Sequence, residues 1–115
     1  MTKPIKVSGG KARPLVQART AFTNHNDQLF GRWETPLLYA VYSYGEHWPL
    51  FVWDGFDWYE NEDKYSVTTS RHHGHTHPFR ETIKVSRTWL RTLIANRIGD
   101  HRQMESFQRS MGLAA

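Results

Sequence analysis

The hydrophobic positions of this 115-residue chain change period once. Across residues 37–60, β-forming and aromatic residues fill three short runs separated by turn residues, a pattern that predicts an antiparallel β-meander. Gly45 begins the first turn, and Asp54-Gly55 is a two-residue hairpin signal at the second. After residue 86, apolar residues recur every three or four positions, which is the period of an amphipathic helix.

The second half of the chain predicts one more strand and two helices. Residues 80–85 alternate, which predicts a strand with Ile83 and Val85 facing inward. Ser86 is a good cap for a helix over residues 87–98, which Gly99 ends. A second helix over residues 101–111 follows, and we expect it to pack through an inner face formed by Met104, Phe107 and Met111. The two helices could also form a helix-turn-helix pair.

These elements predict an α+β fold. A small antiparallel sheet, made of the meander 37–60 and a strand near 80–85, is packed by C-terminal helices 87–98 and 101–111. Residues 1–14 carry Lys or Arg at four positions and are punctuated by Gly and Pro, so we expect a flexible basic arm. Residues 15–115 are the length of a single domain.

The segment 64–78 has a composition that core packing does not explain. It contains five Ser or Thr residues, four histidines and no carboxylate, and Val67 is its only aliphatic residue. The run at residues 67–69 favours a strand by propensity. Ser66 as a cap and Pro78 as a stop favour instead a short helix or a capped loop, which we prefer because apolar alternation is missing.

Hydroxyls and cations in the first half of this segment suit an anion. Backbone N–H groups at a helix N-terminus and short hydroxyls bind phosphate readily. The same hydroxyls could serve only to cap the helix, and this alternative stays open. The candidate ligand or phosphate-binding residues are Lys64, Ser66, Thr68, Thr69, Arg71 and His72.

Three histidines in the second half are candidate metal ligands. His73, His75 and His77 share a face if the segment is extended, whereas only His73 and His77 do so if it is helical. Imidazoles bind Zn²⁺ and similar ions, but a full site needs further ligands and the chain has no cysteine. We prefer a solvated, histidine-rich loop as the explanation for them, so we predict no cofactor and keep a metal ion as a hypothesis.

Charge and aromatic content point to an acidic partner. The formal charge is +4 and the sequence pI is about 9.6, which fits nucleic acid or an acidic protein surface. Exposed aromatic rings on the meander could stack on bases. We expect no membrane span, because no apolar run approaches the required length, and we expect a cytoplasmic protein.

Four short motifs resemble a family of small uncharacterised proteins of bacteriophages and other mobile elements. The motifs are Val41-Tyr42-Ser43-Tyr44, Trp58-Tyr59-Glu60-Asn61, Lys64-Tyr65-Ser66 and Thr68-Thr69-Ser70-Arg71-His72. The resemblance implies a bacterial host cytoplasm and an accessory phage role, and it carries no catalytic residue.

Taken together, the residues and the resemblance favour a non-enzymatic accessory protein that binds nucleic acid or an acidic host protein through residues 64–72. One alternative is a small nuclease, metal-independent or histidine-dependent, because paired histidines can act as acid and base on RNA. Another alternative is a protein-interaction inhibitor of a host or defence system. The oligomeric state does not follow from the sequence.

Overall fold

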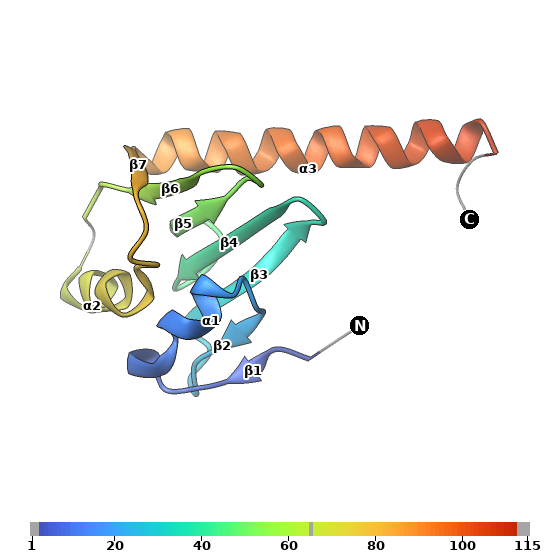
Figure 1. Cartoon of the computed structure of the whole chain (residues 1–115). Helices are drawn as coiled ribbons and strands as arrows, with labels where there is room; N and C mark the ends of the chain where they lie inside the picture. Colours follow the sequence, from blue (N-terminus) through green and yellow to red (C-terminus); the bar gives the residue numbers. More distant parts are fainter. Residues whose placement is uncertain (1–2, 65, 113–115) are drawn as a thin grey trace.

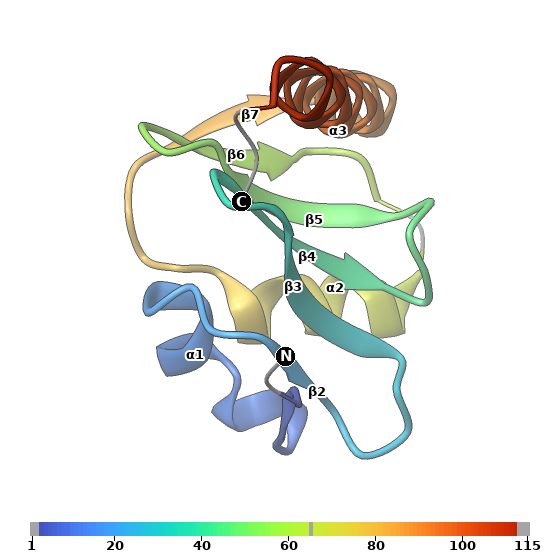
Figure 2. The ribbon, with the colours of Figure 1, turned by 90° about the vertical axis from the view of Figure 1, so that its right-hand side faces the viewer.

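The computed structural model describes residues 3–64 and 66–112, and these form one mixed sheet with helices on both of its faces (Figures 1 and 2). The predicted α+β class is confirmed. The strands follow one another in space as in sequence, and they are β1 (Ile5–Lys6), β2 (Phe22–Thr23), β3 (Leu29–Thr35), β4 (Leu38–Ser43), β5 (Pro49–Trp53), β6 (Trp58–Asn61) and β7 (Thr82–Val85). The helices are η1 (Gly9–Lys11), α1 (Arg13–Gln17), α2 (Val67–Thr76) and α3 (Arg87–Ser110).

The sheet is antiparallel in its middle and parallel at both ends. Strands β2 to β6 pair antiparallel, whereas β1 pairs parallel with β2 and β7 pairs parallel with β6. The prediction of a wholly antiparallel sheet is therefore wrong at its edges. The chain leaves β6, crosses through α2 and returns beside β6 in the same direction, as a crossover connection requires. On the edge strand β7, Ile83 is 45% exposed rather than facing inward.

The predicted two-residue hairpin at Asp54-Gly55 is a four-residue turn. Trp53 pairs with Trp58, which leaves residues 54–57 outside the ladder. The Asp54 carboxylate accepts hydrogen bonds from the backbone N–H groups of Phe56 and Asp57, at 2.9 and 2.8 Å. This side-chain cap competes with the tight type I′ turn and makes the wider loop stable.

The segment expected to be a flexible arm lies on the sheet. Ile5 and Lys6 form β1, and Ala12 is fully buried in the core beside Val16. The apolar residues among the glycines and prolines are therefore enough to anchor part of this segment, although Ile5 and the lysines remain exposed.

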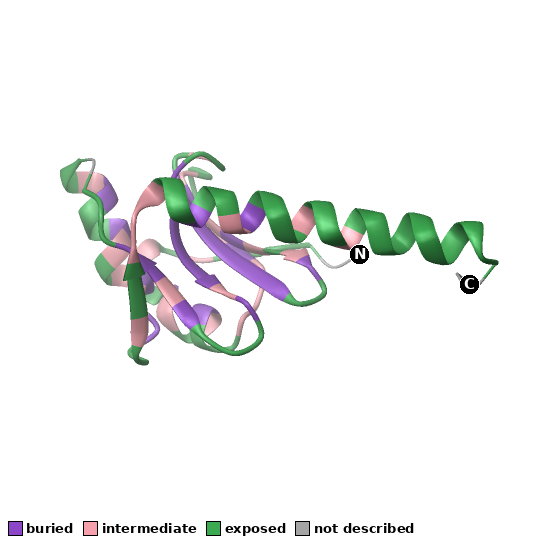
Figure 3. Cartoon of the chain, turned by 90° about the horizontal axis from the view of Figure 1, so that it is seen from above, coloured by how far each residue is buried: buried purple, intermediate pink, exposed green. Residues whose placement is uncertain are grey.

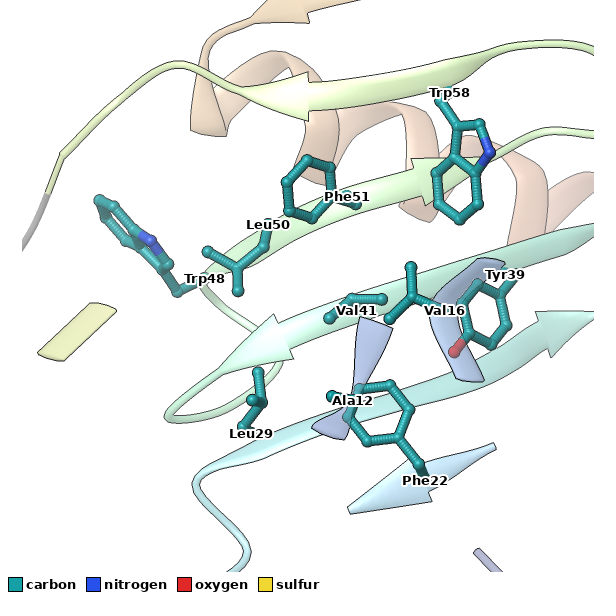
Figure 4. Packing of buried hydrophobic residues seen from close by; sticks show 10 residues of the cluster. All are labelled: Ala12, Val16, Phe22, Leu29, Tyr39, Val41, Trp48, Leu50, Phe51 and Trp58. Atoms are coloured by element: carbon teal, nitrogen blue, oxygen red, sulfur yellow. The ribbon is translucent and has the colours of Figure 1, made fainter. Parts of the chain in front are cut away.

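Each face of the sheet carries its own core. The first core lies under η1, α1 and α2 and is built from large rings and branched side chains (Figure 4). The second lies under α3, where Leu90 and Ile94 are buried against Leu38, Ala40 and Tyr42. The side chains of β4 alternate between the two cores, and all six of its residues are buried.

One continuous helix replaces the two predicted C-terminal helices. α3 runs through Gly99 without a break, because an isolated glycine costs a helix only about 1 kcal/mol. Its second half extends past the sheet (Figures 1 and 3), so Met104, Phe107 and Met111 are 57–60% exposed and form no inner face. The helix-turn-helix interpretation is wrong for the same reason. None of the described helices combines the length and apolar character that crossing a membrane requires.

Alanine substitutions at two glycines should change the free energy of unfolding in opposite directions. A Cβ on Gly31 would lie 2.5 Å from the Tyr39 hydroxyl and 2.6 Å from the Phe22 ring, whereas a Cβ on Gly99 would meet nothing within 4 Å. We expect Gly31→Ala to lower the free energy of unfolding by about 1–3 kcal/mol. Gly99→Ala should raise it by about 0.5–1 kcal/mol. Urea unfolding measures both, and an unchanged midpoint for Gly31→Ala would contradict the close packing described.

Candidate functional site

Helix α2 begins at a side-chain cap, as the sequence predicts. The Ser66 hydroxyl accepts a hydrogen bond from the backbone N–H of Thr69 at 3.1 Å, and the Ser70 N–H donates to the Ser66 carbonyl. The helix ends just before Pro78, whose ring cannot continue it. The hydroxyls of Ser66 and Thr69 therefore serve at least as caps.

One face of α2 is polar yet buried against the sheet. Thr69, His72 and Thr76, spaced by three and four residues, all point inward. The Ser43 hydroxyl at the end of β4 lies 2.8 Å from His72 Nδ1, and it donates a longer bond of 3.4 Å to the Thr69 hydroxyl. Buried polar groups of this kind need such partners, so these bonds fix the register of α2 on the sheet.

A buried carboxylate holds the second side of the helix. The Glu60 side chain, on β6, lies 2.9 Å from His73 Nε2 and 3.3 Å from His77 Nε2. The Thr82 hydroxyl donates a hydrogen bond of 2.5 Å to the same carboxylate. The ring of Phe51 contacts the His73 ring in a tilted arrangement, with centroids 4.8 Å apart. Strands β5, β6 and β7 and helix α2 thus meet at a single acid–imidazole cluster.

The environment favours an ionised Glu60 and neutral His72 and His73 at neutral pH. Burial acts to raise the pKa of Glu60, but the Thr82 hydrogen bond and the nearby His73 hold it below its ordinary value. Burial lowers the pKa of His73, although Glu60 opposes this shift. Burial also lowers the pKa of His72, helped by His75 and Arg71. A neutral His73 can still donate its Nε2 proton to the Glu60 carboxylate.

A cavity of about 320 Å³ opens beside this cluster. His73 and Glu60 form part of its wall, and Lys64 and Lys84 lie at its border. Its other lining residues are Leu50, Asn61, Glu62, Asp63, Thr69 and Ser70. The wall therefore mixes three carboxylates with two ammonium groups, which suits a small ligand of mixed charge better than a bare phosphate.

The six residues predicted to bind phosphate do not converge on one point. Thr69 and His72 face the sheet, and Ser66 caps the helix. Arg71 is exposed and Thr68 is half-buried. Lys64 is exposed at the cavity border, and Tyr65 between it and Ser66 lies outside the described residues. The sequence did not single out Glu60, although it lies two residues after Trp58 in a strand and so shares the face of a buried aromatic side chain.

The three candidate metal ligands separate. His73 and His77 share the Glu60 side of the helix, as the helical interpretation predicts. His75 faces η1 instead, where its buried Nδ1 has no hydrogen-bond partner in the described part of the chain and a Cβ on Gly9 would lie 3.2 Å away. Among residues 3–64 and 66–112, no three or more His, Asp or Glu side chains are placed to hold a metal ion.

The helical layer over this face of the sheet is built from two of the segments of the chain that contain no carboxylate. Neither residues 3–26 nor residues 64–80 contain Asp or Glu, and we call these two segments together the carboxylate-free surface. They hold eight of the 15 Lys and Arg residues, namely Lys3, Lys6, Lys11, Arg13, Arg19, Lys64, Arg71 and Arg80. Folding therefore brings two positively charged segments, which are far apart in sequence, into one layer (Figure 1).

Three hydrogen bonds join these segments. The Arg13 guanidinium donates to the carbonyl oxygens of His77 and Gly74, at 2.8 and 2.5 Å, and the Gln17 amide donates to the Pro78 carbonyl at 2.9 Å. All three acceptors lie at the C-terminal end of α2, where a cation is favoured by the helix dipole. Arg13 also covers the Phe79 ring, 3.7 Å from its centroid.

Comparisons with protein-family models, with curated proteins and with solved structures found no match to this chain. The geometry of the site is therefore the basis for the functional argument below.

The pKa of His72 makes stability depend on pH in a defined direction. Because its folded-state pKa is below the unfolded value of about 6.5, the unfolded chain takes up a proton first as the pH falls. We expect the free energy of unfolding to decrease below about pH 6.5, by at most about 1.4 kcal/mol per pH unit for this group. His72→Gln keeps a polar partner for Ser43 and should flatten that slope in urea unfolding between pH 7 and 5.

The matched control is His25→Gln, which makes the same substitution at an exposed histidine. If His72→Gln and the wild type keep the same pH dependence, His72 does not titrate as described.

Proposed function

We propose that this chain is a nucleic-acid-binding accessory protein of phage type, working in the cytoplasm of a bacterial host. The observation that carries the proposal is the carboxylate-free surface: the helical layer formed by η1, α1 and α2 contains cations and histidines but no acid. A surface of one charge sign attracts a polyanion over the whole area, and the release of counterions from phosphates then drives binding.

The arrangement of the cations supports a backbone contact rather than a single phosphate pocket. Lys11 on η1 and Arg71 on α2 are both exposed, and η1 packs against α2. Cations spread over several elements suit an extended backbone, which offers a phosphate at regular intervals. The network below them orients α2 on the sheet, so Ser66, Thr69 and His72 position the surface instead of binding the ligand.

Reversing two of these charges tests the proposal. We expect the double variant Lys11→Glu, Arg71→Glu to bind labelled oligonucleotides at least about tenfold more weakly at low salt, because two phosphate contacts are replaced by repulsion. The slope of log affinity against log salt concentration should fall by about two units. Fluorescence anisotropy over a salt series with single-stranded and duplex oligonucleotides measures both quantities.

The matched control reverses two exposed arginines on the projecting half of α3, with Arg102→Glu and Arg109→Glu. Both double variants change the net charge equally, so only the location differs. Equal loss of affinity in the two variants would show binding by net charge alone. If the wild type binds no nucleic acid even at low salt, the proposal is overturned and an acidic protein surface becomes the better partner for these cations.

A second function, cleavage of RNA, is favoured by the contact between His73 and Glu60. A histidine at 2.9 Å from a carboxylate, on the wall of a cavity, has the geometry of an oriented general base. The neutral imidazole can take up the proton of a 2′-hydroxyl, whose oxygen then attacks phosphorus. The 5′-oxygen takes up a proton from water and leaves as a hydroxyl, the imidazolium returns its proton to the solvent, and the other product is a cyclic 2′,3′-phosphate.

This activity predicts that purified protein converts RNA to fragments with cyclic phosphate ends in the presence of a chelator. His73→Ala should abolish the cleavage while the oligonucleotide still binds. His25→Ala should leave it unchanged because that side chain lies on the β2–β3 turn, apart from the cavity. Intact RNA after prolonged incubation with the wild type, with and without divalent metals, would exclude the activity.

A further inference from the structure

A second cavity lies at the border of the carboxylate-free surface, away from the acid–imidazole cluster. It measures about 350 Å³, and three aromatic side chains, Trp53, Phe56 and Trp58, form its apolar part. Arg19 and Arg80, both members of the carboxylate-free surface, line it as well. Asp57 and Glu81 complete the wall. Aromatic rings next to arginines and a few hydrogen-bond acceptors are the components of sites that hold nucleobases.

The Phe56 ring is the most exposed large hydrophobic side chain among the described residues, at 86%. It sits on the turn between β5 and β6, where the Asp54 carboxylate binds its backbone N–H at 2.9 Å and fixes its position. Leaving a phenyl ring in water forgoes stabilisation that burial would provide. A rigid turn that holds such a ring outward presents a flat face on which a planar ligand can stack.

The other side of the cavity is held by Arg19. Its backbone φ of 51° lies in the left-handed region, which is unfavourable for a side chain with a Cβ. The Arg19 carbonyl accepts a hydrogen bond from the Trp33 indole N–H at 2.8 Å, and its guanidinium lies 4.9 Å from the centre of the Trp53 ring. Strained backbone of this kind persists where the surroundings hold it, and here it aims a cation at the cavity.

A second exposed phenyl ring lies next to Arg80 in the chain. Phe79 precedes Arg80 in the chain, is 66% exposed and also has a positive φ, of 54°. Arg13 covers one of its sides. Phe79 and Phe56 therefore present two rings in the neighbourhood of Arg80, at the edge of a surface that attracts phosphates.

We propose that this cavity takes an unpaired nucleobase, so that the ligand of the carboxylate-free surface is a single-stranded nucleic acid. This inference rests on the proposed function. The base stacks on Phe56 and offers its exocyclic amino or ring N–H groups to the carboxylates of Asp57 and Glu81. The backbone phosphates run toward Arg19 and Arg80, because the two carboxylates repel them from the opposite wall. A duplex keeps its bases stacked inside the helix and cannot make this contact.

The test compares Phe56→Ala with Phe107→Ala, which removes an equally large exposed ring from the projecting half of α3. Labelled single strands of about 12 nucleotides, of DNA and of RNA, and the duplex of the same length are titrated at low salt. We expect the wild type to prefer the single strands and Phe56→Ala to weaken them about 5- to 100-fold. Phe107→Ala should bind as the wild type does. Phe56→Trp keeps a ring for stacking and should retain the affinity.

The outcomes separate this inference from the function on which it rests. The base site would be overturned if the wild type bound duplex and single strand equally well and Phe56→Ala had the affinity of the wild type. The proposed function would survive that result if the double variant Lys11→Glu, Arg71→Glu lost binding. Loss of affinity in Phe56→Trp as well as in Phe56→Ala would also overturn stacking. Absence of binding to every oligonucleotide would overturn both the inference and the proposed function. A difference between the DNA and RNA strands would identify which of them the site takes.

Discussion

The burial of β4 on both faces is the constraint on which the rest of this structure depends. All six residues of the strand are buried, with Tyr39 and Val41 facing one core and Leu38, Ala40 and Tyr42 facing the other. A strand of this kind needs a cover on each side, because apolar area left in water gives up about 25 cal/mol per Å². Helix α3 supplies one cover, and the layer of η1, α1 and α2 supplies the other.

The two covers are attached to the sheet by different kinds of interaction. α3 packs through Leu90 and Ile94, so its contact with the sheet is apolar. α2 places polar side chains on the sheet, and its contact depends on matched hydrogen bonds to Ser43 and on the Glu60 carboxylate. Polar contacts of this kind fix position and orientation more strictly than apolar ones, because each group left without a partner is costly. The orientation of the basic surface therefore follows from a buried polar interface.

Segregation of charge follows from the same arrangement. The acids are concentrated in the sheet turns and around the Glu60 cavity, and the cations of two distant segments share one layer. The sequence motifs at residues 41–44, 58–61 and 68–72 include Ser43, Glu60, Thr69 and His72, which lie where α2 joins the sheet, and Ser66 caps that helix. In this structure those residues attach a helix to the sheet, and whether they also bind a ligand stays a prediction.

Local signals in the sequence were sufficient for much of the fold. The meander, the Ser66 cap and the apolar stripe at Leu90 and Ile94 follow from period, propensity and capping, which act over a few residues. The same local rules failed at Gly99, where the sequence contains a stop signal that a continuous helix tolerates. They also failed at Asp54, whose carboxylate caps a wider turn than the dipeptide predicts.

Only the tertiary structure decided which residues meet. The sequence by itself determined the α+β class, the basic character and the composition of residues 64–78. Pairing Glu60 with His73 and His77, turning His75 away from them, and placing Lys11 beside the helix of Arg71 depend on contacts between residues far apart in the chain. Such contacts depend on how the helices on each face pack against the sheet. The local pattern of residues along the sequence does not specify that packing.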